Sequence, residues 1–208
     1  MPLVVILIGL SLAITQCTDL SALDEDLATR NESEELAIQS AELTDDEVSG
    51  ILFMREEEKL ARDVYLYLYE IYPLRPFLNI SKSEQAHMDA IKYLIDTYEL
   101  EDPVGENPPG VFQNKDLQLL YNELIEQGAA GRAEALQVGA LIEEVDIIDL
   151  QTELEEHATH EDVVRVYGNL CSASENHLRA FVRVLRLYDV EYQPEKLDQA
   201  SFDRIMEE

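Results

Sequence analysis

Four long stretches of the chain carry apolar residues at alternating intervals of three and four positions, which is the period of an amphipathic α-helix. They run from Asp46 to Tyr72, from near Ser81 to Tyr98, from about Arg132 to Glu156 and from about Glu161 to Tyr188. The 208 residues include only 8 Gly and 7 Pro, so little interrupts these helices. The periodicity therefore predicts an all-α protein.

The connections between the stretches constrain how the helices are arranged. Short turns join the first helix to the second and the third to the fourth. The middle connection is about 34 residues long, from Tyr98 to Ala133, and includes a short helix around Asp116 to Gln127. A connection of that length can travel the whole length of a bundle. We therefore expect a four-helix bundle with one long crossover between helices 2 and 3, which is the ferritin-like connectivity.

Charge excludes one large class of partners. The chain has 15 Lys and Arg against 44 Asp and Glu, a formal net charge of −29. Such a field repels phosphate backbones, which excludes nucleic acid as a partner. With 46% hydrophobic residues the chain is still apolar enough to form a core.

The N-terminal residues indicate export. Leu3 to Ile14 form an apolar run that is too short to span a bilayer but fits the core of a secretory signal. Cys17 follows where an exported lipoprotein carries its lipidated cysteine, so a membrane tether through Cys17 is one expectation. The alternative is a misassigned start or a buried apolar arm, in which case the protein would be cytoplasmic.

These patterns divide the chain into four parts. Residues 1–17 are expected to be the export segment, and residues 18–47, which are rich in acids, a disordered acidic tether. Residues 48–190 are expected to form the bundle. Residues 191–208 are expected to be a C-terminal tail with a short helix around Leu197 to Met206.

Ionisable residues interrupt each of the four apolar stripes. The interruptions are Glu58 in the first helix, Glu84 and His87 in the second, Glu143 in the third, and Ser174 and His177 in the fourth. An unpaired buried carboxylate costs several kcal/mol, so it must be protonated, paired or bound to a cation. No Lys or Arg lies on the same stripes, which favours a metal site. The alternative is that these acids lie on a solvent-facing side of their helices.

Spacing within the second helix supports the metal interpretation. Residues three positions apart point the same way from a helix, so Glu84 and His87 can reach one ion together. Two single Glu residues and two Glu-x-x-His pairs make the di-iron or di-manganese site of ferritin-like bundles.

Four segments resemble known families. Glu56-Glu-Glu-Lys-Leu-Ala-Arg-Asp-Val-Tyr65 resembles the first-helix signature of ferritin-like rubrerythrins, and Ser83-Glu-Gln-Ala-His-Met88 resembles the second-helix Glu-x-x-His. More specifically, Met54 to Tyr65, Val138 to Leu150 and Asn176 to Phe181 resemble the ferritin-like family called domain of unknown function 2202. The resemblance covers about residues 48–190. It implies a ferritin-like fold with a metal site and no established reaction.

One position departs from the ferritin-like pattern. Those proteins have a Glu three residues before the last His, whereas this chain has Ser174 before His177. Asp146, one turn after Glu143, could supply the missing carboxylate. The predicted ligands are therefore Glu58, Glu84, His87, Glu143, Asp146 and His177. A single-metal or mixed-metal site stays an open alternative.

The ligand types favour iron or manganese, one or two ions, over a closed zinc site. The implied function is that of an oxidoreductase of peroxidase or ferroxidase type, with a small oxidant (peroxide or dioxygen) and an unknown electron donor as partners. Tyr65, two turns after Glu58, could donate an electron, although such a Tyr is more often core. Assembly into a homodimer is left open. The alternative function is a non-enzymatic interaction or stress protein whose metal site is vestigial.

Overall fold

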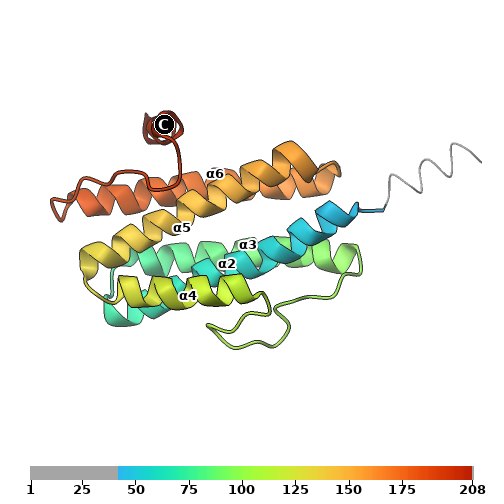
Figure 1. The fold of residues 1–208 in the computed structure, drawn as a ribbon, viewed down its shortest axis with the longest axis horizontal. Coiled ribbons are helices and arrows are strands. Elements are labelled where there is room, and N and C mark those ends of the chain that lie inside the picture. The colour runs from blue at the N-terminus through green and yellow to red at the C-terminus, as the bar shows by residue number, and fades with distance from the viewer. Residues whose placement is uncertain (1–41, 208) are drawn as a thin grey trace, which may run out of the picture. The chain divides into compact units, whose positions relative to one another are not determined.

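The computed structural model describes residues 42–207, and these are helical with no strand among them. The elements are α2 (Asp45–Ile71), α3 (Arg75–Thr97), α4 (Lys115–Gly128), α5 (Arg132–Thr152), the π-helical turn η1 (Glu153–His157), α6 (Glu161–Arg186) and α7 (Gln199–Glu207). The all-α prediction is confirmed (Figure 1).

The four long helices pack as two neighbouring pairs. Helix α2 packs against α3 and α5 against α6, while α3 also contacts α6 and α2 contacts α5. The long connection between α3 and α5 contains α4, which brings the chain back beside α2 and contacts both α2 and α5 (Figure 1). The core therefore lies between α2, α3, α5 and α6, with α4 as an added cover.

Local signals account for where the helices begin and end. Thr44 caps α2 in a capping box with Glu47, and Asn114 caps α4. Helix α3 begins at Arg75, earlier than Ser81, because a proline is tolerated in the first helical turn. The third long helix was expected to run to Glu156 as an α-helix, but the α-helix ends at Thr152 and the chain continues as the wider η1 turn.

Helix α2 is buried around more of its circumference than its apolar stripe predicts. Arg55, Glu56, Glu57, Lys59 and Asp63 are buried in addition to Glu58. The connection between α3 and α4 covers four of them: Arg55 pairs with Asp102, Lys59 donates to the Pro108 carbonyl oxygen, Asp63 accepts from the Gly110 N–H, and Glu56 accepts hydrogen bonds from the backbone N–H groups of Gln113 and Asn114. These four buried charges thus have partners outside the core stripe, whereas Glu57 faces α5.

The predicted divisions of the chain can be compared with the structure only in part. Helix α2 includes residues 45–47, which were assigned to the tether, and α7 lies in the predicted tail. The export segment, Cys17 and the rest of the tether up to residue 41 lie outside the described residues. Within the described part of the chain, no helix has the length and apolar character needed to cross a membrane.

Candidate metal centre

Five of the predicted ligands converge between the four long helices. Glu58 comes from α2, Glu84 and His87 from α3, Glu143 from α5 and His177 from α6. The carboxylates are no more than 2% exposed, and the two imidazoles are 7% and 9% exposed. Charged groups this deeply buried need partners.

The side chains form two groups that share one residue. In the first group, Nδ1 of His87 lies 3.1 Å from Oε2 of Glu58 and 2.8 Å from Oε2 of Glu84. In the second, Nδ1 of His177 lies 3.0 Å from Oε1 of Glu84 and 3.3 Å from Oε2 of Glu143. In each group the three donor atoms all lie within 4.8 Å of one another. Glu84 therefore gives one oxygen to each group.

Some buried polar atoms of the cluster are not hydrogen-bonded among the described residues. Oε1 of Glu58 has no partner, and Oε1 of Glu84 and Nδ1 of His177, although 3.0 Å apart, do not meet with the geometry of a hydrogen bond. Donor atoms bound at about 2.1 Å to one ion and at right angles to each other lie about 3 Å apart. The imidazole–carboxylate separations of 2.8–3.3 Å match that spacing, so each group could hold a cation.

Without a cation, protonated imidazoles offset the negative charge of the buried carboxylates. Burial alone would lower the pKa of His87, but the facing carboxylates of Glu58 and Glu84 raise it to about 11. Burial likewise opposes the charge of His177, yet Glu143 and Glu84 raise its pKa to about 10. Burial would raise the pKa of Glu84, but the two imidazoles lower it to about 2. Burial and the nearby Asp146 raise the pKa of Glu58 well above its usual range.

Comparisons with known proteins identify the family. A model of an uncharacterized protein domain, DUF2202, matches residues 47–208. The chain belongs to the DUF2202 family. An uncharacterized protein of Methanocaldococcus jannaschii, MJ0754, is 45% identical over 164 residues, which are 79% of this chain and 88% of that protein. A crystal structure of the hypothetical protein MJ0754 superposes with a TM-score of 0.78 at 44% identity, covering 80% of this chain and 94% of the other.

This DUF2202 protein places Asp146 and Ser174 together beside the two groups. Ser174 donates a hydrogen bond from its Oγ to Oδ2 of Asp146, and both side chains are buried. Oδ1 of Asp146 has no hydrogen-bond partner among the described residues. Burial and the charge of Glu143 raise the pKa of Asp146 to about 7. Asp146 belongs to neither group of three, so the structure does not place it as it places the other five predicted ligands.

Tyr65 contacts the candidate centre through the carboxylate of Glu143. Its hydroxyl donates a 2.6 Å hydrogen bond to Oε1 of Glu143, and the side chain is fully buried. The ring packs against Phe181 at a centroid distance of 5.3 Å. Tyr65 is thus both part of the core and a contact of the candidate ligand Glu143.

Sequence reasoning missed Glu57. Its side chain is 4% exposed and shares a hydrogen bond with the carboxyl group of Asp149, while its Oε2 has no partner among the described residues. Burial and the charges of Asp146 and Asp149 raise its pKa well above the usual range. Glu57 lies off the apolar stripe, so no periodic signal could have found it. Its burial depends on how α2 and α5 pack.

Proposed function

We propose that this DUF2202 protein is a ferritin-like four-helix bundle that holds two iron or manganese ions and uses them for redox chemistry on peroxide or dioxygen. The observation that carries the proposal is the shared position of Glu84. One carboxylate with an oxygen in each of two His–Glu groups is the arrangement expected of a bridging ligand in a two-metal site.

The donor set supports iron or manganese. Glu58, Glu84 and His87 would hold one ion, and Glu84, Glu143 and His177 the other. Carboxylate oxygen and imidazole nitrogen in this proportion suit these metals better than a sulfur-seeking ion. When bound, such ions would supply electron transfer and a coordination position open to a small oxidant.

Neighbouring side chains would orient the ligands. The Tyr65 hydroxyl holds Oε1 of Glu143, which leaves Oε2 directed toward His177. Ser174 holds Oδ2 of Asp146 in the same way. Tyr65 would also donate an electron to the centre, and its hydrogen bond to Glu143 supports this role.

Metal content of four isosteric variants tests the ligand assignment. Glu84→Gln should lose both ions because both groups use Glu84, whereas Glu58→Gln and Glu143→Gln should each lose about one. Glu56→Gln is the matched control, because Glu56 is equally buried on α2 but bonds to the backbone of Gln113 and Asn114. Elemental analysis on folded protein gives the stoichiometry. Equal metal content in the Glu84 and Glu56 variants would remove Glu84 from the centre.

A second experiment tests the redox reaction. Protein loaded anaerobically with ferrous iron should oxidise faster than free iron when mixed with hydrogen peroxide or air, as measured by stopped-flow absorbance. The Glu56→Gln variant should react like the wild type, and Glu84→Gln like free iron. If the loaded protein reacts no faster than free iron, the redox proposal fails, and a metal-binding protein without enzymatic activity becomes the better description.

A further inference from the structure

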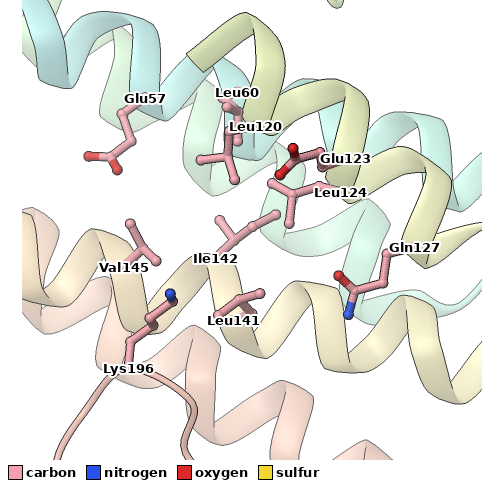
Figure 2. A pocket seen from close by; sticks show the side chains of 10 residues that line it. All are labelled: Glu57, Leu60, Leu120, Glu123, Leu124, Gln127, Leu141, Ile142, Val145 and Lys196. Atoms are coloured by element: carbon pink, nitrogen blue, oxygen red, sulfur yellow. The ribbon is translucent and has the colours of Figure 1, made fainter. Parts of the chain in front are cut away.

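A cavity of about 200 Å³ lies beside the candidate centre, between α2, α4 and α5. Its lining is mixed: Leu60 from α2, Leu120 and Leu124 from α4 and Ile142 from α5 are apolar. The polar members are Glu57, Glu123, Gln127 and Lys196, and the last three of these are exposed. Figure 2 shows two charged groups at one end of this space, with Glu57 on the α2 side and Lys196 reaching in from the C-terminal segment. The cavity therefore combines apolar side chains from three helices with a polar end, and it is partly open to solvent.

The cavity shares its walls with the candidate centre. Glu57 and Ile142, which line the cavity, each precede a candidate ligand by one position, namely Glu58 and Glu143. Neighbouring residues on a helix point about 100° apart. The same two helices thus turn one face to the centre and an adjacent face to the cavity.

Glu57 gives the cavity a specific polar contact. Its carboxyl group is buried and directed into the space between α2 and α5, and its Oε2 has no hydrogen-bond partner among the described residues. A hydroxyl group both donates and accepts, so it can bond this carboxyl group in either protonation state. The carboxylates of Glu57 and Glu123 repel an anion. Any ion would also lose hydration among the leucine side chains, which is energetically costly, so a neutral ligand is favoured.

The size of the cavity limits that ligand to a few heavy atoms. A cavity of about 150 Å³ lined by Leu, Ile and Phe is known to bind benzene in another protein. This cavity is somewhat larger, so it can accept a six-membered ring that carries a hydroxyl group. From these observations we infer that the cavity binds a small neutral molecule with a hydroxyl group on an apolar body, of which phenol is the simplest aromatic example.

This inference names a ligand class next to the candidate centre, but it stands apart from the metal proposal because its test requires no metal. Phenol is titrated into the full chain in the presence of a chelator, and binding is followed by calorimetry into the millimolar range. We expect saturable binding of one phenol per chain. Benzene should bind about five-fold more weakly, since it lacks one hydrogen bond, and benzoate should not compete.

Two adjacent leucines of α4 provide a matched pair of variants. Leu120 lines the cavity, whereas Leu119 is 60% exposed and lies outside it. Leu120→Trp should fill the cavity and abolish phenol binding, and Leu119→Trp should leave binding unchanged. Leu141→Trp fills the same cavity from α5 and serves if the Leu120 variant does not fold.

Three results would overturn the inference. The first is the absence of saturable phenol binding to folded protein. The second is binding that survives Leu120→Trp and Leu141→Trp as well as it survives Leu119→Trp. The third is equal affinity for phenol, benzene and benzoate, which would show that the cavity binds apolar molecules without selecting for a hydroxyl group. Loss of metal in the ligand variants would change none of these outcomes.

Discussion

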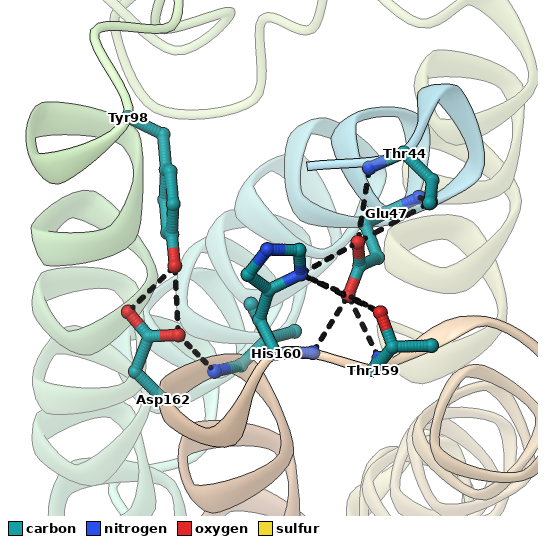
Figure 3. Close-up of polar contacts among 7 residues, drawn as sticks. Thr44, Glu47, Tyr98, Thr159, His160 and Asp162 are labelled. Carbon is teal, nitrogen blue, oxygen red and sulfur yellow. Dashed lines mark hydrogen bonds and ion pairs between the residues drawn. The ribbon is translucent and has the colours of Figure 1, made fainter. Parts of the chain in front are cut away.

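Glu47 links the start of α2 to the turn that precedes α6. Its side chain is 1% exposed. Oε2 accepts a 3.0 Å hydrogen bond from the Thr44 backbone N–H, and Oε1 accepts bonds of 2.7 and 2.9 Å from the backbone N–H groups of Thr159 and His160 (Figure 3). Nδ1 of His160 lies 2.9 Å from both oxygens. One carboxylate therefore caps α2 and fixes the start of α6.

The pKa of Glu47 measures how strongly the folded protein prefers its ionised form. Burial alone would raise this pKa, but the hydrogen bonds from Thr44, Thr159 and His160 lower it from 4.5 to about 2. Since one pKa unit is equivalent to about 1.4 kcal/mol, the lowering amounts to about 3 kcal/mol of stability. Because the folded-state pKa is depressed, this stability is present above pH 4.5 and is lost as the pH falls toward 2.

The perturbation is Glu47→Gln, which keeps the shape of the side chain and removes the charge. We expect the free energy of unfolding to fall by about 3 kcal/mol at neutral pH and the difference from wild type to shrink as the pH drops below 4.5. Urea denaturation followed by far-ultraviolet circular dichroism measures both, with a chelator present throughout. Glu70→Gln is the control, because Glu70 lies exposed on the same helix and should change stability by less than about 0.5 kcal/mol.

The pH dependence separates the charge argument from other causes. A difference between Glu47→Gln and wild type that is as large at pH 3 as at pH 7 would refute it. The loss would then come from the shape of the hydrogen-bonded turn and not from the carboxylate charge. A difference below about 0.5 kcal/mol at neutral pH would refute the magnitude as well.

Two further predictions concern the centre and the core. The pKa values of His87 and His177 are about 11 and 10 in the metal-free protein, so a cation must displace their protons. Metal affinity should therefore fall as the pH falls, and metal binding should release protons. Calorimetry in buffers of different ionisation enthalpy measures this release, and metal uptake that does not depend on pH would contradict the ligand assignment. A Cβ at Gly139 would lie 2.5–2.7 Å from the Phe181 ring, so Gly139→Ala should destabilise the protein by about 1–3 kcal/mol. Gly168 on α6 has nothing within 4 Å of such a Cβ, and Gly168→Ala should instead stabilise it by up to about 1 kcal/mol in the same urea experiment.

The helices could be predicted from the sequence because their signals are local. Apolar residues at intervals of three and four, a proline after Tyr72 and the glycines before Arg132 place the ends of α2, α4 and α5 within a few residues. The same logic found the acids and histidines that interrupt the stripes, since a buried face is a periodic property. The five side chains that converge between the helices were all identified in this way.

Features that depend on contacts between distant segments could not be predicted. A lysine off the apolar stripe is expected to be exposed to solvent. Lys59 is nevertheless buried, because the connection from α3 to α4 covers it and Asp63 pairs with it. Glu47 was assigned to a disordered tether, but it is tied to residues 112 and 113 positions later in the chain, Thr159 and His160. Periodicity within one helix carries no information about such partners.

Ser174, which stands where the ferritin-like pattern has a glutamate, shows both what the sequence can predict and what it cannot. The sequence shows that α6 lacks the carboxylate that the ferritin-like pattern requires, and that Asp146 lies one turn from Glu143 on α5. It cannot show that the small Ser174 side chain leaves room for Asp146 and also donates a hydrogen bond to it. A glutamate at position 174 would have to occupy the space beside Asp146 and would place a second negative charge there. The serine on α6 and the aspartate on the neighbouring helix α5 are therefore best understood as one hydrogen-bonded pair beside the two groups.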